Sequence, residues 1–327
     1  MLLVSPEPPD YVFGVDGASH ELRQLRDGTW TIHSRLEDEC FHPGLGPAAE
    51  AKALYVEQLK VRERMEQQEG CFVVWDVGLG SGANALTFLR ETGDLPVEVE
   101  MLSFDHTLEP LRLALRSPDR LPYVAGFEEA LRQLLEKGEW REGNRHWKLV
   151  EGDFPGLMKN EAAEKLPRPD VIFHDAYSPG KNPEMWTLPL FEGIRRQVGD
   201  KACMLATYSR STMLRVSLLL AGFHVGVGRP TGVQEETTIA ATRKDLLEEP
   251  LESGWLDRVR IPSLLGQPER SASFERPFLL FTVLVDHDDV KPTVRVYPLK
   301  FFYGPFDRNR CGLIVEPVRV MPPRRRR

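Results

Sequence analysis

Three glycines, Gly78, Gly80 and Gly82, alternate with other residues directly after the apolar run at residues 73–77. Glycine reaches positive φ angles and leaves no Cβ between the backbone and a ligand. The helix expected after the loop would present free N–H groups and the positive end of its dipole. The pattern is typical of the place where the sheet of an α/β protein meets a nucleotide-like cofactor.

Two cofactors fit this loop. Gly78, Gly80 and Ala83, with Asp105 some twenty residues on, satisfy the dinucleotide fingerprint. Asp76 stands two residues before the first glycine, where a carboxylate can accept a bond from the cationic S-adenosylmethionine but would face the pyrophosphate of a dinucleotide. Asp105 would hold ribose hydroxyls under either interpretation. We therefore favour S-adenosylmethionine and keep a nicotinamide cofactor as the alternative.

The segment at residues 151–154 follows a strand-like run and contains Asp153 and Phe154. The acid can accept from an adenine amino group and the ring can stack on the base. The alternative is a turn aspartate that caps the next element.

The segment at residues 170–186 carries the most specific chemistry. An apolar strand delivers Asp175 to its carboxyl end, where ligands of α/β sheets bind. Prolines and a glycine then build a stiff loop, and we predict substrate contacts within it from Tyr177, Pro179, Lys181 and Trp186. By strand alternation His174 points to the opposite face from Asp175, so we expect it to pack in the core.

The composition is that of a soluble globular protein, with 41% hydrophobic and 28% charged residues among 327. The net charge of −7 disfavours a simple nucleic-acid binder, and the arginine tail at 324–327 reads as a solvated end. The N-terminus lacks the features of a signal peptide and no run is long enough to span a membrane. We expect a cytoplasmic protein with four core thiols: Cys40, Cys71, Cys203 and Cys311.

Apolar strand-like and helix-like patterns alternate through the middle of the chain. This order predicts an α/β fold with a doubly wound, mostly parallel Rossmann-like sheet. The predicted strands are 72–77, 99–104, 147–150, 170–174, 202–207, 223–228 and 237–242. The main predicted helices are 83–91, 108–116, 126–137 and 211–221, with a further helix at 48–67 before the sheet.

Four regions are expected along the chain. Residues 1–10 form a flexible leader, and 11–70 an N-terminal extension with a β-hairpin turning at Asp27-Gly28, a loop at 34–46 and the helix at 48–67. Residues 71–246 form the cofactor domain. Residues 247–327 form a small C-terminal appendage with strands at 277–285 and 293–298.

Residues 25–243 resemble the methyltransferase module of the bifunctional enzyme of tRNA 5-methylaminomethyl-2-thiouridine synthesis, and its stand-alone relatives. The resemblance rests on Asp27-Gly28-Thr29 with Ser34, on 44–55 with Glu50, on 76–84, and on Asp175-Ala176 through Pro179, Lys181-Asn182-Pro183 and Met185-Trp186. The last stretch is similar to the family's signature D-G/A-F/Y-x-P-x-K-N-P-x-M-W.

The resemblance implies S-adenosylmethionine-dependent N-methylation of an aminomethyl group at C5 of the wobble uridine in tRNA. It does not extend to a flavin oxidase module, so a single-activity form is expected. It adds Asn84 to the cofactor site, which then comprises Asp76, Gly78, Gly80, Gly82, Asn84, Asp105, Asp153, Phe154 and Asp175. It also adds Glu50 to the substrate site.

Methyl transfer to an amine requires a deprotonated nitrogen held in line with the methyl group. We hypothesise that Asp175 is the catalytic residue, which accepts a hydrogen bond from the neutral amine, and no metal is required. The segment at 232–238 carries Glu235 and Glu236 where the family has basic residues. A small-molecule amine is therefore an alternative acceptor. A non-enzymatic alternative is a methyltransferase fold that serves only as an RNA-associated interaction module.

Overall fold

The computed structural model describes residues 19–230, 235–252, 254–255, 281–286 and 293–298. Contacts divide the chain into two units, Met1–Leu251 and Glu252–Arg327. The leader, the start of the predicted hairpin, Cys311 and the arginine tail lie outside the described residues. Among those that are described, no helix has the length and apolarity needed to cross a membrane.

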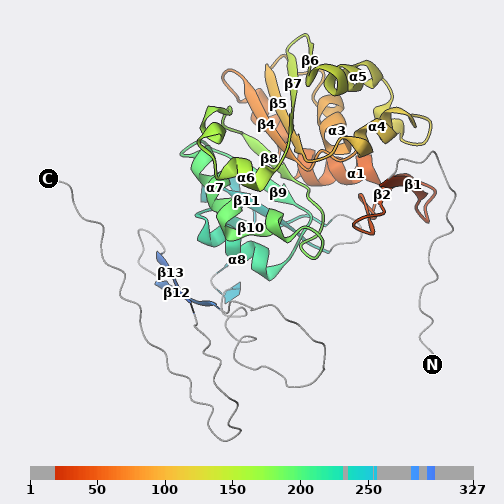
Figure 1. Ribbon diagram of the computed structural model, residues 1–327. Coiled ribbons are helices and arrows are strands. Elements are labelled where there is room, and N and C mark those ends of the chain that lie inside the picture. Colours follow the sequence, from red (N-terminus) through yellow and green to blue (C-terminus); the bar gives the residue numbers. More distant parts are fainter. Residues whose placement is uncertain (1–18, 231–234, 253, 256–280, 287–292, 299–327) are drawn as a thin grey trace, which may run out of the picture. The chain divides into compact units, whose positions relative to one another are not determined.

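An eight-stranded sheet forms the centre of the first unit, in the order β10-β11-β9-β8-β4-β5-β7-β6 (Figure 1). The neighbours from β9 to β7 pair in parallel, whereas β6, β10 and β11 pair antiparallel with their neighbours. The strands are β4 (Phe72–Val77), β5 (Val99–Asp105), β6 (Glu139–Glu142), β7 (Arg145–Glu151), β8 (Val171–His174), β9 (Met204–Thr207), β10 (His224–Gly228) and β11 (Thr237–Ala241). The predicted α/β class and mostly parallel sheet are confirmed, and β6 is an edge strand that the sequence pattern did not indicate.

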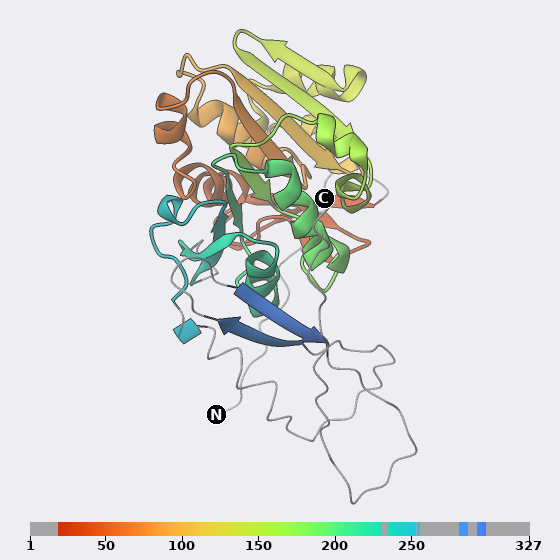
Figure 2. The same ribbon diagram turned by 90° about the vertical axis from the view of Figure 1, so that its left-hand side faces the viewer.

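Helices cover both faces of the sheet (Figures 1 and 2). Because side chains alternate along a strand, Val74 of β4 joins the core beneath α3, whereas Val73, Trp75 and Val77 join the core beneath α7. The first face carries α1 (Pro47–Ala51), α2 (Val61–Glu66), α3 (Ala83–Glu91), α4 (Glu109–Leu115) and α5 (Glu128–Lys137). The second face carries α6 (Phe154–Met158), α7 (Leu188–Val198) and α8 (Thr212–Leu220).

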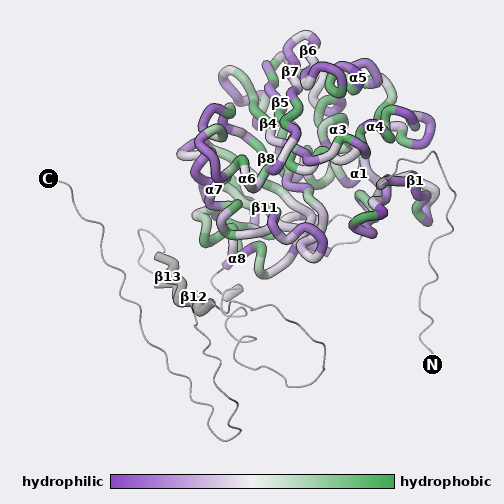
Figure 3. Tube along the Cα trace, viewed as in Figure 1, coloured by the Kyte–Doolittle hydropathy of each residue, from purple (hydrophilic) through white to green (hydrophobic). Residues whose placement is uncertain are grey.

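Short helical turns connect several of these elements. Hydrophobic and hydrophilic residues alternate along the strands and helices of the first unit (Figure 3). The 3₁₀ turns are η2 (Pro122–Val124), η3 (Glu161–Lys165), η4 (Pro183–Trp186) and η5 (Lys244–Leu246). Of the thiols expected in the core, Cys203 is buried, but Cys40 and Cys71 are only half-buried. These three are free cysteines.

The prediction of one helix at 48–67 is wrong. These residues form α1, the π-helix η1 (Lys52–Glu57) and α2, and the helical conformation is interrupted at Lys60, whose φ is 50°. In the π-helix the Gln58 amide donates to the carbonyl of Ala53, five residues earlier, at 3.2 Å. The wider turn directs Tyr55 into the core, where its hydroxyl lies 3.5 Å from the carbonyl oxygen of His174.

A three-stranded antiparallel sheet precedes α1 and consists of β1 (His20–Gln24), β2 (Trp30–Ser34) and β3 (Glu39–Cys40). The expected hairpin turn is confirmed: Gly28 has a φ of 87°, and the Thr29 amide donates to Asp27 Oδ1 at 2.9 Å. The segment expected to be a loop at 34–46 differs, because β3 interrupts it. In the second unit β12 (Phe281–Asp286) pairs antiparallel with β13 (Thr293–Pro298), close to the two strands expected there.

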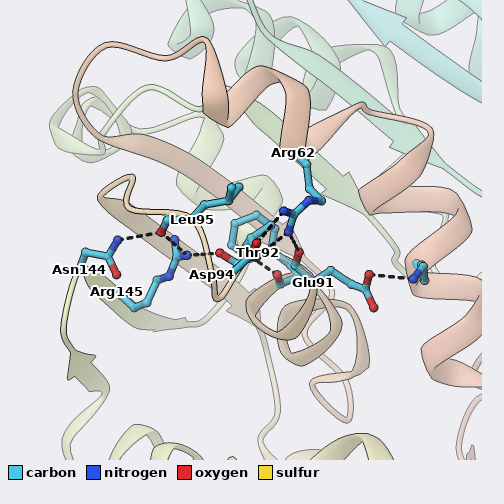
Figure 4. A network of polar contacts seen from close by, with 9 residues as sticks. Arg62, Glu91, Thr92, Asp94, Leu95, Asn144 and Arg145 are labelled. Carbon is cyan, nitrogen blue, oxygen red and sulfur yellow. Dashed lines mark hydrogen bonds and ion pairs between the residues drawn. The ribbon is translucent and has the colours of Figure 1, made fainter.

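A polar network lies where β5 and β7 begin, at the amino ends of the central strands (Figure 4). The buried Arg145 guanidinium donates to the carbonyl oxygens of Thr92, Leu95 and Val97. Asn144 Nδ2 donates to the carbonyls of Leu95 and Val97 at 3.2 and 2.7 Å. These bonds complete the backbone of the turn that leads from α3 into β5.

Arg62 of α2 joins this network to the first face of the sheet (Figure 4). Its two terminal nitrogens bind both oxygens of Asp94, at 2.7 and 2.8 Å, and one also donates to the Glu91 carbonyl. Lys52 adds an ion pair to the Glu91 side chain at 2.8 Å. The loop is thus tied to both η1 and α2.

Candidate active site

A cavity of about 870 Å³ opens at the carboxyl ends of the central strands. Its walls come from the segments after β4, β5, β7 and β8, from Tyr208 after β9, and from the connection between β3 and α1. A cavity of this size can take a cofactor and part of an acceptor. Eight of the sequence-predicted site residues line it: Glu50, Gly78, Gly80, Asp105, Asp153, Phe154, Asp175 and Tyr177.

The glycine loop is closely packed from two sides. Gly78, Gly80 and Gly82 have φ values of 93°, 52° and 82°. A Cβ on Gly78 would lie 2.5 Å from the carbonyl oxygen of Asp175, and one on Gly80 would lie 2.9 Å from the Phe41 ring. Only glycine fits both the backbone conformation and the space at these positions.

Asp105 holds the loop in place. Its Oδ2 accepts from the Gly80 amide at 2.8 Å, and its Oδ1 accepts from the amides of His106 and Thr107 at 2.8 and 3.2 Å. Each carboxylate oxygen keeps further acceptor capacity, and the residue lines the cavity. The predicted contact of Asp105 with ribose hydroxyls stays a prediction.

Asp153 and Phe154 form another part of the wall. Asp153 has an extended backbone at the start of α6, and its side chain makes no capping hydrogen bond there, in contrast to the cap alternative. The Phe154 ring packs on Phe104, with centroids 4.8 Å apart, and edge-on to Trp75. An acceptor beside an apolar wall suits the polar edge and the face of an adenine.

Asp175 is held by side chains from two distant segments. His42 Nε2 lies 3.0 Å and Asn84 Nδ2 2.7 Å from the same oxygen, Asp175 Oδ2. Burial alone would raise the pKa of Asp175, but the charge of His42 and the two hydrogen bonds outweigh it, so the pKa lies below its usual value. Asp175 is therefore an ionised carboxylate at neutral pH.

His42 is correspondingly a cation. Burial lowers its pKa, but the Asp175 carboxylate and, more weakly, Glu50 outweigh this effect and raise the pKa to about 9. Glu50 itself is buried, and burial raises its pKa. Its Oε2 atom has no hydrogen-bond partner among the described residues.

The loop after Asp175 divides into a cavity side and a core side. Tyr177 lines the cavity and contacts His20 Nε2 at 3.2 Å and the Phe41 ring edge-on. Trp186 is buried instead: its Nε1 donates to the Tyr177 carbonyl at 2.8 Å, and it packs edge-on against His174. Trp186 thus packs this loop onto the core and is not placed to touch a substrate.

Six predicted site residues do not line the cavity: Asp76, Gly82, Asn84, Pro179, Lys181 and Trp186. Asn84 acts through Asp175, and Lys181 is exposed outside the cavity. Asp76 is fully buried and its Oδ2 accepts from Ser103, whose hydroxyl also accepts from Trp147. Asp76 was predicted to bind the cofactor and so to distinguish the two cofactors. It is buried beside Ser103 and does not line the cavity.

The sequence pattern did not indicate His42, Phe41 or Tyr208, which also line the cavity. His42 stands alone in the irregular stretch between β3 and α1, where no periodicity assigns its direction. Pro43 and Gly44 next to it mark a tight turn, which is the signal available from sequence. His174, expected to pack in the core, does so: it is buried, and its Nε2 lies 2.9 Å from the Met185 carbonyl.

The described residues contain no group of three or more His, Cys, Asp or Glu side chains arranged to hold a metal ion. The donor set of the cavity is instead that of an organic ligand. A glycine loop without Cβ atoms, the Asp105 carboxylate and the aromatic wall fit a nucleoside, and the unpartnered Glu50 oxygen adds an acceptor for a cationic group. These features fit S-adenosylmethionine.

Comparison with known proteins agrees with this fit. A family model described as S-adenosyl-L-methionine-dependent methyltransferase matches residues 132–243. The tRNA 5-methylaminomethyl-2-thiouridine biosynthesis bifunctional protein MnmC of Paraburkholderia phymatum is 29% identical over 210 residues, which are 59% of this chain and 30% of that protein. The protein of the same name from Leptospira interrogans is 25% identical over 240 residues, 69% of this chain and 36% of the relative.

The crystal structure of MnmC2 from Aquifex aeolicus has a TM-score of 0.59 and 26% sequence identity, and the match covers 76% of this chain and 77% of that one. The chain spans about a third of the length of the two curated relatives, 30% and 36%. The resemblance to the methyltransferase part of such proteins is confirmed. The alternative of a nicotinamide cofactor is therefore wrong.

Proposed function

Because the chain is an S-adenosylmethionine-dependent methyltransferase, we propose that its acceptor is the aminomethyl group at C5 of the wobble uridine in tRNA. The proposal is supported by the similarity to the MnmC proteins, whose names specify 5-methylaminomethyl-2-thiouridine biosynthesis in tRNA. It is also supported by the chemistry of the cavity. The observation that carries it is the position of Asp175, which lines the same cavity as the glycine loop and is held by His42 and Asn84.

The carboxylate suits an amine acceptor. An ionised carboxylate accepts hydrogen bonds and donates none, so Asp175 can bind the N–H groups of an amine and direct its lone pair. An alkylammonium is not a nucleophile, so the nitrogen must release its proton to water before the transfer, and Asp175 then binds the neutral amine. When bound, S-adenosylmethionine supplies the electrophilic methyl group. Gly78, Gly80, Asp105 and the Asp153–Phe154 pair are the residues that would hold it.

The rate then depends mainly on position and charge. Asp175 holds the acceptor nitrogen close to the reacting carbon, and this orientation alone can supply a large part of the rate. The carboxylate also stabilises the positive charge that develops on nitrogen during the transfer. Glu50 adds a second acidic group to the same cavity, which favours a cationic amine over an anionic acceptor.

A uridine must leave the anticodon stack to reach this cavity. Tyr177 offers an aromatic surface at the cavity wall and is held there by Phe41 and His20. We assign Tyr177, and not Trp186, as the surface on which the base would stack.

The test is transfer of labelled methyl from S-adenosylmethionine to tRNA that carries unmethylated aminomethyluridine, followed by nucleoside analysis. We expect label at the wobble uridine, and no label in the same tRNA made by transcription without the aminomethyl group. No label in either tRNA, with binding of S-adenosylmethionine intact by calorimetry, would contradict the proposed acceptor.

A small-molecule amine remains the second candidate, because the net charge is −7 and two acids, Glu235 and Glu236, stand before β11. Glu236 pairs with the buried Arg215 at 3.2 Å, so this segment adds no free positive charge for phosphates. The rest of the segment, 232–234, lies outside the described residues. Label in free 5-aminomethyluridine or simple alkylamines, but not in tRNA, would favour this candidate.

A further inference from the structure

His42 reaches the site from a segment outside the central sheet, which also brings Glu39 and Phe41 to the cavity wall. It lies between β3 and α1, with a φ of 47°, an unfavourable conformation for a residue with a Cβ. Its side chain is 9% exposed, it lines the cavity, and its Nε2 lies 3.0 Å from Asp175 Oδ2. Strained backbone of this kind persists where the surrounding structure enforces it, and it concentrates at functional sites.

The geometry around Asp175 is asymmetric. His42 and Asn84 both donate to Oδ2, and the Tyr55 hydroxyl of η1 is a further hydrogen-bond partner of the carboxylate. Two donors from different segments fix both the position of the carboxylate and the rotation of its plane. We propose that His42 is a positioning residue for methyl transfer: with Asn84 it clamps one oxygen of Asp175 so that the other meets the acceptor nitrogen in a defined direction.

This inference rests on the proposed amine acceptor and extends it. The titratable groups that interact with the pair of His42 and Asp175 come from several elements: Glu50 of α1, Tyr55 of η1, Asp76 of β4, His174 of β8 and Tyr208 after β9. Of these groups and the pair itself, only His42 carries a positive charge. It therefore offsets the acidic surroundings that would otherwise oppose an ionised Asp175.

His42 acts through Asp175 and does not remove the acceptor's proton itself. With a pKa raised to about 9 by Asp175 and Glu50 against the effect of burial, the ring already carries its second proton at neutral pH. A doubly protonated imidazole donates from both nitrogens and accepts at neither. The ring keeps Asp175 ionised and fixed, which is a positioning role.

The experiment compares His42→Ala, His42→Gln and His33→Gln in the full chain. Glutamine can place a neutral donor near the position of His42 Nε2, whereas alanine removes it. His33 is the matched control, because it is also largely buried (3% exposed, against 9% for His42) and contacts Asp38 at 3.2 Å and Glu21 at 3.3 Å, yet does not line the cavity. The measurements are kcat and KM for the aminomethyluridine tRNA and the Kd for S-adenosylmethionine.

We expect His42→Ala to lower kcat by about 10–100-fold, on the order of a lost positioning contact, with the Kd for S-adenosylmethionine changed less than about threefold. His42→Gln should restore a substantial part of kcat, and His33→Gln should leave kcat unchanged. Wild-type kcat in His42→Ala would overturn the proposal. A parallel loss of cofactor affinity and kcat in both His42 variants would also overturn it, because that result describes a structural role.

Failure of the proposed acceptor would look different. The wild-type protein would then bind S-adenosylmethionine but transfer no methyl to this tRNA. NMR titration of the histidine rings, with His42 assigned by comparison with His42→Gln, decides the pairing without any turnover. A His42 pKa that falls in Asp175→Asn supports the clamp, and a His42 pKa that stays the same in that variant overturns it.

Discussion

Two groups of polar residues lie at opposite ends of the same strands and differ in how their hydrogen-bonding atoms are paired; in the amino-end group Arg145 is buried, whereas Asp94 is exposed. At the amino ends, Arg145, Asn144 and Arg62 direct their donors to backbone carbonyls and to Asp94. At the carboxyl ends, His42 Nδ1, Glu50 Oε2 and Asn84 Oδ1 are buried without a hydrogen-bond partner among the described residues. None of the labelled residues of the amino-end network has such an atom.

The difference separates stability from chemistry within one sheet. An unpaired buried polar atom costs about 1–3 kcal/mol, so a fold keeps few of them. The amino-end network follows this rule and closes the turn before β5. The carboxyl-end cluster departs from it where a ligand would supply the missing partners. Mutations in the two regions should therefore affect different measurements.

The largest effect is expected for Asp175→Asn. The amide keeps an oxygen for the bonds from His42 and Asn84 but loses the charge that orients the acceptor amine. We expect kcat to fall by about 10²–10⁴-fold, the range for a lost acid–base or charge-stabilising group, with cofactor affinity retained by calorimetry. An equal loss of cofactor affinity and kcat would show that Asp175 has a structural role and no direct role in the transfer.

Arg145→Met tests the opposite region. The change removes the three hydrogen bonds that the buried Arg145 guanidinium donates to the carbonyls of Thr92, Leu95 and Val97, and should lower the free energy of unfolding by about 2–4 kcal/mol. Denaturant titration measures this loss, and kcat below the melting transition should stay near wild type. The matched control is Arg141→Met, because Arg141 is 66% exposed and its ion pair with Glu139 spans 3.7 Å. A lowered kcat in Arg145→Met, measured where the variant is fully folded, would contradict the assignment of this region to stability alone.

Two glycines with nearly the same backbone sharpen the comparison. Gly78 and Gly70 have φ values of 93° and 86°, so alanine is strained at both, by about 1–2 kcal/mol. Only at Gly78 would the new Cβ meet a neighbour, the Asp175 carbonyl at 2.5 Å, whereas Gly70 has nothing within 4 Å. Gly78→Ala should therefore also lower kcat and cofactor affinity, while Gly70→Ala should change unfolding alone. Equal kinetics for both variants would contradict this close packing.

The last prediction concerns the stability of the fold at different pH, which should depend in opposite ways on two carboxyl groups. Burial raises the pKa of Asp76 to about 7, so its contribution to stability is complete below about pH 4 and is lost as the pH rises to 7. The hydrogen bonds from Arg62 lower the pKa of Asp94 to about 2, so its contribution is present above about pH 4 and is lost as the pH falls to 2.

Urea unfolding of Asp76→Asn and Asp94→Asn against wild type across pH 3–8 measures these slopes. For the buried Asp76, one proton changes the free energy of unfolding by at most about 1.4 kcal/mol per pH unit, whereas solvent screens the exposed Asp94 and makes its slope shallower. For Asp76 the advantage of wild type over the variant should shrink with rising pH, and for Asp94 it should grow. Curves that run parallel to wild type in both variants would contradict the assignment.

Much of the scaffold could be predicted because its signals are local. The apolar run of β4 followed by alternating glycines identifies a strand, a loop and a helix from adjacent residues. The run before Asp175 places its carboxylate at the edge where the glycine loop also ends. Parallel pairing of β4 with β8 then brings the two segments together.

The rest depends on packing that no local pattern encodes. His42 meets Asp175 across 133 positions of sequence, from a stretch without periodicity. Asp76 and Asp105 both lie near strand ends. The Asp76 side chain accepts a hydrogen bond from Ser103 of the neighbouring strand β5, whereas Asp105 lines the cavity. Residues 48–67 keep a helical apolar spacing, and over so few turns that spacing does not distinguish an α-helix from a π-helix.

The π-helix at Lys52–Glu57 has a consequence for evolution and design. A π-turn corresponds to one residue inserted into an α-helix, and one residue rotates a helix by roughly 100°. A single deletion that restored regular winding there would turn Glu50 relative to α2 by that angle, and carry it away from the cavity. The deletion would thus remove an acidic group from the cavity without replacing Glu50 itself. Natural or designed relatives that differ by one residue in this helix are therefore expected to differ in the amines they accept before they differ in fold.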